Sequence, residues 1–146
     1  MPSQPFRRIV YGSSTPALLG PDAIADILRR SRRNNSAEGV TGALLYADGN
    51  FIQVLEGPPE AVNRTYGRIL CDSRHRRVSV YLDRPADERM FPDWSMGLLH
   101  AADLSYEDRV GVRSLLHDPD GATGAVGHLL RTFRSMASGT PRAVRV

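Results

Sequence analysis

The first polar and apolar positions of the chain predict one strand followed by one helix. Residues 6–11 (FRRIVY) are apolar and β-prone, and residues 12–16 (GSSTP) are expected to end that strand. Pro21 suits the first turn of a helix, whose apolar positions recur at i, i+3, i+4 and i+7 from Ile24. At roughly 100° per residue, Asn35 lies only about 20° from Ile24 around this helix, so Asn35 falls at the C-terminal end of the buried stripe.

The next segments predict a hairpin, a second helix and two more strands. Gly39 is expected to end the first helix, and the Asp-Gly pair at 48–49 joins strands at 40–46 and 51–56 as antiparallel neighbours. Pro58-Pro59-Glu60 opens a second helix. Its expected apolar face consists of Val62, Thr65, Tyr66, Ile69 and Leu70. A charged exit at 72–77 leads to strands at 78–82 and 94–99.

The resulting order is β-α-β-β-α-β with an extra fifth strand. This order predicts an α+β, ferredoxin-like fold in which two helices cover one face of a sheet. After His100 the pattern changes, and helices are expected at 104–117 and 126–136, with a break at 118–121 and a frayed tail from 137. We therefore expect a domain over residues 1–100 and a C-terminal helical extension and tail over residues 101–146.

An amide stands in the middle of the third strand. Alternation places Phe51, Gln53 and Leu55 on one face of that strand, beneath the predicted helices. A buried amide needs hydrogen-bond partners, because leaving it unpaired is costly. Gln53 is therefore either a core residue bonded to the backbone or to a tyrosine, or part of a binding site.

Other polar or aromatic groups are expected to converge on Gln53. Tyr11 ends the first strand, Asn35 ends the buried stripe of the first helix, and Trp94 and Met96 start the fifth strand on a common face. Each of these residues also has an ordinary structural explanation. Together they describe a slot between two helices with an amide-rich floor, which suits a flat heteroaromatic ring.

Composition and charge exclude several classes of protein. The chain of 146 residues is 41% hydrophobic and 24% charged, which is typical of a globular domain, and no apolar run is long enough for a transmembrane helix. Without a recognisable signal peptide, the expected location is the cytoplasm. The lone Cys71 is expected to be buried filler on a helix. All 19 basic residues are arginine, but with a net charge of +3 we expect a solvated surface rather than a nucleic-acid site.

Four segments carry a resemblance to a known family. They are IVYGSS, SRRNNSAEGVTGALLYADGNFIQVLEG, RILCDSRH and ERMFPDWSMG, in this order between about Arg7 and Leu98. In combination they resemble the BLUF family of flavin-binding blue-light sensors. The resemblance implies that residues 1–100 form a photosensor domain that holds FAD non-covalently between two helices. It does not extend clearly into the C-terminal 45 or so residues.

The resemblance also implies site residues and a mechanism. Tyr11 and Gln53 match the photochemical relay, in which the tyrosine gives the flavin an electron and a proton through the glutamine. Trp94 and Met96 match the switch, and either could flank the ring. The implied flavin contacts are Ile24, Asn34, Asn35, Gln53, Arg68, Ile69, Asp72 and His75. Light leaves Gln53 rearranged, and the flavin absorption shifts reversibly to the red.

The resemblance predicts a photosensory protein without substrate turnover and without a metal. We expect an unidentified downstream protein partner and a homo-oligomer, with no membrane contact. The C-terminal helices are expected to cover the far face of the sheet and to form or adjust a partner or dimer surface.

Two other functions fit the same topology. An acylphosphatase-like hydrolase would need a glycine-rich, arginine-bearing phosphate loop after the first strand, and residues 12–16 offer little of it. An RNA-binding module would need exposed aromatics on the central strands, for which Tyr11 and Phe51 are candidates.

Overall fold

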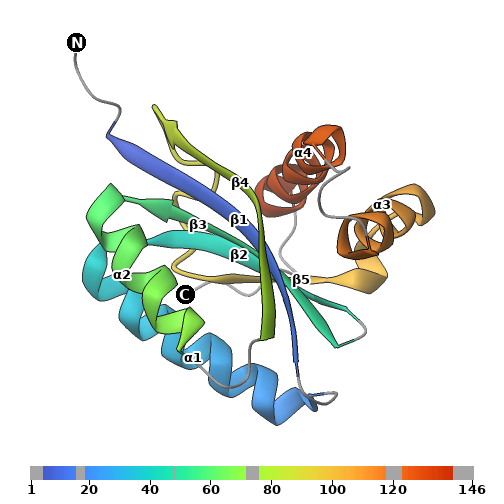
Figure 1. The fold of residues 1–146 in the computed structure, drawn as a ribbon, viewed down its shortest axis with the longest axis horizontal. Coiled ribbons are helices and arrows are strands. Elements are labelled where there is room, and N and C mark those ends of the chain that lie inside the picture. The colour runs from blue at the N-terminus through green and yellow to red at the C-terminus, as the bar shows by residue number, and fades with distance from the viewer. Residues whose placement is uncertain (1–4, 16–18, 48, 72–75, 118–122, 140–146) are drawn as a thin grey trace.

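The protein forms one five-stranded sheet with helices on both faces (Figure 1). The structure is a computed structural model and describes residues 5–15, 19–47, 49–71, 76–117 and 123–139. The strands are β1 (Phe6–Ser14), β2 (Thr41–Ala47), β3 (Asn50–Gly57), β4 (Arg76–Ala86) and β5 (Gly97–His100). The helices are α1 (Pro21–Glu38), α2 (Pro59–Leu70), the short 3-10 helix η1 (Ala101–Asp103), α3 (Tyr106–His117) and α4 (Thr123–Gly139).

The strand order across the sheet is β4-β1-β3-β2-β5. Neighbouring strands are antiparallel except for β2 and β5, which run parallel. The first four strands and α1 and α2 therefore form the expected ferredoxin-like arrangement, with β5 added beside β2. Helices α1 and α2 cover one face, here called the near face, and α3 and α4 lie over the opposite, far face (Figure 1).

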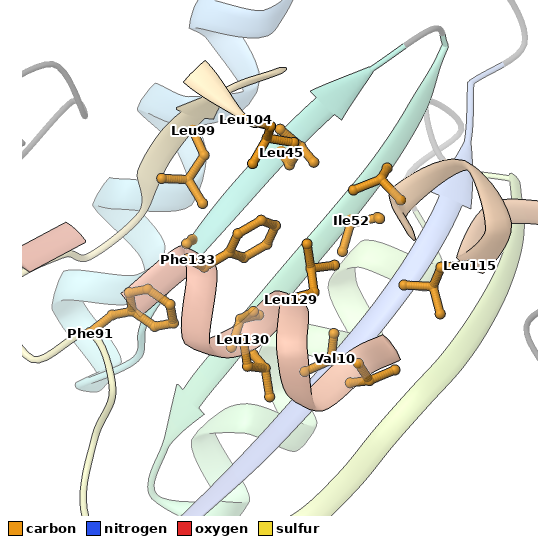
Figure 2. Packing of buried hydrophobic residues seen from close by; sticks show 14 of the residues in the cluster. Val10, Leu45, Ile52, Phe91, Leu99, Leu104, Leu115, Leu129, Leu130 and Phe133 are labelled. Carbon is orange, nitrogen blue, oxygen red and sulfur yellow. The ribbon is translucent and has the colours of Figure 1, made fainter. Parts of the chain in front are cut away.

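The two faces of β3 belong to two separate hydrophobic clusters. Phe51 and Leu55 join the near-face cluster with Tyr11, whereas Ile52 and Val54 join the far-face cluster. This division confirms the alternation predicted from the sequence, because successive side chains of a strand point to opposite faces. In Figure 2, the far-face side chains of the sheet point toward helix α4.

The C-terminal helices complete the far-face core, as expected. Leu115 of α3 and Phe133 of α4 are fully buried in the same cluster as Val10, Leu45 and Ile52 of the sheet (Figure 2). Their apolar side chains remove the far face of the central strands from water, which is the dominant favourable term in folding.

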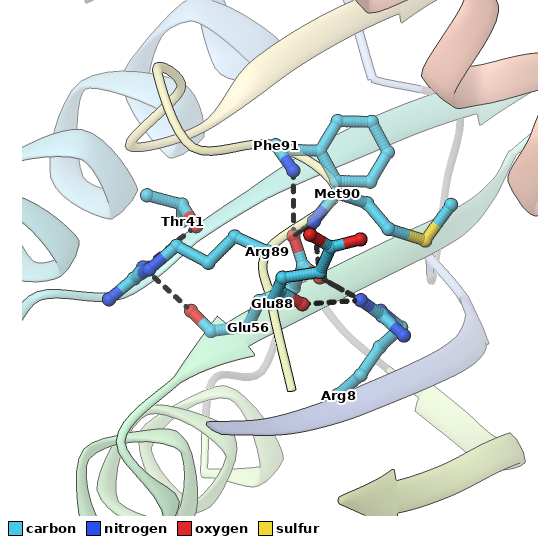
Figure 3. A network of polar contacts seen from close by, with 7 residues as sticks. All are labelled: Arg8, Thr41, Glu56, Glu88, Arg89, Met90 and Phe91. Carbon is cyan, nitrogen blue, oxygen red and sulfur yellow. Dashed lines mark hydrogen bonds and ion pairs between the residues drawn. The ribbon is translucent and has the colours of Figure 1, made fainter. Parts of the chain in front are cut away.

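A buried carboxylate ties the end of β3 to the segment that follows β4. Glu56 is fully buried, and its carboxylate accepts hydrogen bonds from the backbone N–H groups of Met90 and Phe91 at 2.8–2.9 Å (Figure 3). Arg8 of β1 forms an ion pair with the same carboxylate at 2.8 Å. The pairing offsets the cost of burying the charge and fixes the chain shortly before Trp94.

Several strand boundaries differ from the sequence prediction, including that of β4, which runs over Arg76–Ala86 rather than 78–82. Strand β1 does not end at Tyr11 but continues to Ser14, because its last residues pair with Asn50–Ile52 of β3 and with β4. Strand β5 begins only at Gly97, so the prediction that Trp94 starts a strand is wrong.

The end of α2 also corrects two expectations. Leu70, assigned to the apolar face, is 50% exposed, and Cys71, expected to be buried, is exposed at the end of the helix. Both residues follow Ile69, which packs against the near-face cluster, and point away from it.

None of the helices in the described part of the chain combines the length and the apolar character needed to cross a membrane.

Candidate functional site

Strand register brings Tyr11 and Gln53 together at the centre of the near face. The two residues are direct partners in the antiparallel pairing of β1 with β3. Side chains of directly opposite residues lie close enough to interact. The Tyr11 hydroxyl donates a hydrogen bond to Oε1 of Gln53, and both side chains are buried.

The other end of the Gln53 amide faces a sulfur atom. Its Nε2 donates to Sδ of Met96 at 3.5 Å, and a thioether is only a weak acceptor. The backbone of Met96 is itself held by α1, because Nε of Arg32 donates to its carbonyl at 2.9 Å. Gln53 is thus bonded well on its oxygen side and poorly on its nitrogen side.

Asn35 fixes the segment before Met96 from the end of α1. Its Nδ2 donates to the carbonyl of Ser95 at 2.6 Å, and Asn35 is buried, as its place on the helical stripe predicted. Gly39, with φ of 72°, ends α1 in the left-handed conformation that glycine adopts without strain. This ending leaves Asn35 in the last turn, facing residues 95–96.

Trp94 and Met96 do not share a face, which corrects the sequence prediction. Met96 belongs to the near-face cluster with Tyr11, whereas Trp94 belongs to the far-face cluster and stacks on Phe91 with ring centroids 6.0 Å apart. The reason is that residues 94–96 are not a strand, so the two-residue alternation does not apply to them. In this structure Met96, not Trp94, contacts Gln53.

The surroundings of Tyr11 keep its phenol neutral. Complete burial raises the pKa of Tyr11 well above its ordinary value, because the phenolate would lose its solvation, and Tyr66 raises the pKa further. The Tyr66 ring of α2 meets the Tyr11 ring edge-on, with centroids 5.3 Å apart. Tyr11 therefore holds its proton at neutral pH and donates it to Gln53.

Of the helix residues expected to contact a flavin, some pack against the near-face cluster and others are exposed. Ile24 of α1 and Ile69 of α2 are half-buried and pack against the near-face cluster. Asn34 is exposed. Arg68 forms an ion pair with Glu38 at 2.9 Å, which links α2 to the end of α1. Asp72 and His75 lie outside the described residues.

Sequence reasoning missed three contributors to this site. Arg32 donates to the Met96 carbonyl, and Glu38 links α1 to α2 through its ion pair with Arg68. Ser95 supplies the backbone carbonyl that accepts from Asn35. Both Arg32 and Glu38 lie on α1, but their partners, Met96 and Arg68, are distant in sequence. Only the tertiary fold could identify them.

The polar groups of the near face fit a flat heteroaromatic cofactor. The Gln53 nitrogen has only the Met96 sulfur as a partner among the described residues. Unsatisfied buried groups are uncommon and require an explanation. A ring bearing both carbonyl and N–H groups at its edge, as a flavin does, would supply a stronger partner.

The burial of the aromatic side chains rules out the RNA-binding arrangement considered above. Tyr11 and Phe51 are both 0% exposed, and Tyr46 packs against Phe51 at 4.9 Å between ring centroids. Bases can stack only on exposed rings, so these strands present no such platform. Residues 12–14 lie in β1 rather than in a phosphate-binding loop.

A family model and several known proteins match the chain. The model for BLUF, described as sensors of blue light using FAD, matches residues 6–97. A photoactivated adenylate cyclase subunit beta from Euglena gracilis is 39% identical over 140 residues, covering 94% of this chain. This chain spans only 15% of that relative's length.

Solved structures agree with this assignment. The dark-state structure of BlrB, a BLUF protein, has a TM-score of 0.74 and 32% identity, and the match covers 91% of this chain and 98% of that one. A bacterial light-regulated adenylyl cyclase has a TM-score of 0.66 and 29% identity over 89% of this chain and 39% of its own. With the family match over residues 6–97 and the buried Tyr11–Gln53 pair, the chain belongs to the BLUF family of blue-light flavin sensors.

Proposed function

We propose that Tyr11 and Gln53 form the light-driven relay of this blue-light sensor, with Met96 and Asn35 holding the relay in place. The observation that carries the proposal is the Tyr11–Gln53 hydrogen bond in a buried site whose amide nitrogen faces only the Met96 sulfur. An amide can both donate and accept, and the weak bond from Nε2 to sulfur holds only loosely the end that would turn toward Tyr11. Gln53 therefore suits a two-state switch.

The flavin would lie on the near face, held by residues from both helices. We propose FAD as the cofactor, in keeping with the description of the family. Asn35 and Gln53 would bond the polar edge of the ring, while Ile24 and Ile69 would supply apolar contacts. Asn34, Arg68, Asp72 and His75 remain proposed contacts. Arg68 would have to exchange part of its pairing with Glu38 to reach the cofactor.

The chemistry divides between cofactor and protein. The bound flavin supplies the absorption of blue light and an excited state that accepts an electron. Tyr11 is the electron donor, and because its phenol is neutral, the proton leaves together with the electron. Gln53 would accept that proton on Oε1 and pass one from Nε2 to the flavin. After the flavin returns an electron and a proton to Tyr11, the side chain would hold the same atoms as before, as a rotated amide or as the imidic acid tautomer.

The output would pass through Met96 to the C-terminal helices. Met96 directly precedes β5, and η1 and α3 follow β5 along the chain. A rearranged Gln53 alters its contact with the Met96 sulfur, and this change would bias the position of residues 95–100. We propose that a cytoplasmic protein partner, or a second copy of the chain, reads the change at the helical extension of residues 101–146, and that the chain turns over no substrate.

Absorption spectroscopy tests the relay. The purified protein should show a flavin spectrum that shifts to the red after a blue flash and recovers in the dark. Tyr11→Phe and Gln53→Leu should retain flavin but lose the shift, whereas Tyr106→Phe, at a position 76% exposed on α3, should keep it. A shift that survives in Tyr11→Phe, or a protein that takes up no flavin, would contradict the proposal. Chromatography of the released flavin then identifies FAD or FMN.

Hydrogen exchange tests the output route. We expect backbone exchange in residues 97–117 to differ between dark and illuminated protein, because these residues follow Met96. Truncation after His100 is less informative, since it would expose the far-face cluster. Equal exchange in this segment in both states would contradict the route without affecting the relay.

A further inference from the structure

A hollow of about 880 Å³ lies at one end of the sheet, beside the far-face cluster rather than between α1 and α2. It is lined by the ends of β1, β2 and β3, by β4, and by residues of η1 and α3. This volume lies within the range of small-molecule sites. The flavin site does not account for it, because α1 and α2 supply none of its described lining.

The charge of the lining has one sign. Arg77, Arg109 and Arg113 line the hollow, and no carboxylate is among its described lining residues. None of the three guanidinium groups has a side-chain partner within the part of the chain that the structure describes. The hydroxyl groups of Ser79 and Tyr81 line the same space. Guanidinium forks and hydroxyl donors are the groups that bind phosphate oxygens.

Strand β4 has irregular pairing and an unusual backbone conformation where it borders this hollow. The pairing of β1 with β4 shifts register between Gly12 and Ser14, opposite Arg77, and again at Tyr81. Arg77 has φ of 53°, a left-handed conformation that a non-glycine residue adopts at a cost. Bulges of this kind are frequent beside functional sites, where they redirect side chains.

Helix α3 supplies the opposite wall. Arg109 and Arg113 are four positions apart and so lie on one face of the helix. The same helix buries Val112 and Leu115 in the far-face cluster, which fixes it on the sheet. The two arginines are therefore held by a packed element opposite Arg77.

We propose that this hollow is a binding site for a small molecule that carries phosphate groups, either an inorganic polyphosphate or a nucleotide. The three arginines would neutralise the phosphate charge, and the Ser79 and Tyr81 hydroxyls would donate further hydrogen bonds. The volume of the hollow suits a small ligand better than an extended acidic peptide. The site is independent of the flavin chemistry proposed above.

Tyr81 places this site next to the relay. An added Cβ at Gly12 would overlap the Tyr81 phenol, so the ring lies directly on Gly12. Gly12 is the neighbour of Tyr11 in β1. A ligand that contacts Tyr81 is thus separated from the Tyr11 backbone by a single residue.

Calorimetric titration of the purified, flavin-loaded protein tests the site, with pyrophosphate, ATP and adenosine as probes. We expect saturable binding of ATP, of pyrophosphate or of both, and none of adenosine. Arg113→Ala and Arg109→Ala should each weaken binding about tenfold or more, the effect of losing a charge-assisted hydrogen bond. Arg33→Ala, an exposed arginine on α1 outside the hollow, is the matched control and should leave the affinity unchanged.

The outcomes separate the possible ligands. Binding of both phosphates points to the phosphate chain alone, and binding of ATP only points to a nucleotide. The proposal is overturned if neither phosphate binds, if Arg33→Ala weakens binding as much as Arg113→Ala, or if binding releases the flavin. It is also overturned if only a polyglutamate peptide binds. Because heat is measured rather than colour, the result stands whether or not the photochemistry proves correct.

Discussion

The two faces of the sheet bury side chains of different character. The near face places Tyr11, Gln53 and Asn35 within its core, and each of them makes a specific hydrogen bond. The far-face cluster consists of apolar side chains and is completed by helices that follow β5, and the buried Glu56 carboxylate at the end of β3 is paired with Arg8 and with backbone N–H groups. An apolar cluster offers one packing arrangement, whereas a buried amide offers two. The contrast indicates that the near face carries the switch and the far face carries stability.

The faces are joined at few places. At Gly12 the Tyr81 ring packs on the strand that bears Tyr11. In the segment before β5, Trp94 packs in the far-face cluster and Met96 in the near-face cluster. A change on the near face can therefore reach the far face through β1 or through the segment before β5. The predictions below separate these contributions, beginning with the largest effect.

Removal of a large far-face side chain should have the greatest effect on stability. Phe133 is fully buried, and Phe133→Ala should lower the free energy of unfolding by about 3–5 kcal/mol, measured by urea denaturation. Tyr106→Ala on α3, where the side chain is 76% exposed, should change it by less than about 0.5 kcal/mol. If the two variants were equally stable, the far face would not be the main source of stability.

Loss of the buried carboxylate should come next. Glu56→Ala removes the acceptor shared by Arg8 and the backbone N–H groups of Met90 and Phe91, and should cost about 3 kcal/mol. Glu56→Gln keeps one oxygen acceptor and should recover part of this loss. Chemical denaturation of both variants provides the measurement, and equal stability of Glu56→Gln and Glu56→Ala would show that the oxygen acceptor contributes nothing.

A methyl group at Gly12 tests the contact between the faces. Gly12→Ala should displace the Tyr81 ring and cost about 1–3 kcal/mol, the usual range for overpacking. Gly67→Ala on α2 is the matched control, since an added Cβ there meets nothing within 4 Å. It should raise stability by about 0.5–1 kcal/mol, because alanine favours a helix. A neutral Gly12→Ala would mean that Tyr81 moves aside freely.

A surface pair at the edge of the near face should have the smallest effect. Arg7 pairs with Asp83 at 2.6 Å, and this contact lowers the pKa of Asp83 below its ordinary value. A lowered carboxyl pKa in the folded state adds stability above the unfolded pKa, and this stability is lost as the pH falls through the folded value. Asp83 is 42% exposed, so the effect is below about 1 kcal/mol.

The pH dependence of unfolding measures this pair. Between pH 7 and pH 3, wild type should lose slightly more stability than Asp83→Asn, which cannot titrate at this position. An identical pH profile for wild type and Asp83→Asn would show that the pair contributes nothing.

Local patterns predicted most of the architecture. The alternation of residues 51–56, the helical spacing from Ile24 and the stop at Gly39 are properties of neighbouring residues, and the structure agrees with each. The burial of Asn35 followed from its angle around the helix. The family resemblance rested on residue types in a linear order, so it too required no tertiary information.

Tertiary contacts decided what local patterns could not. Strand register placed Tyr11 opposite Gln53, and long-range pairing extended β1 to Ser14. Trp94 and Met96 were assigned to one face because alternation was assumed, but the chain there is held by the Glu56 carboxylate and by Asn35 rather than by a continuous strand ladder. The arginines of the hollow come from β4 and α3, which only the folded chain brings together. The sequence by itself thus determined the elements and the chemical groups, whereas their meeting depended on contacts between residues far apart in the chain.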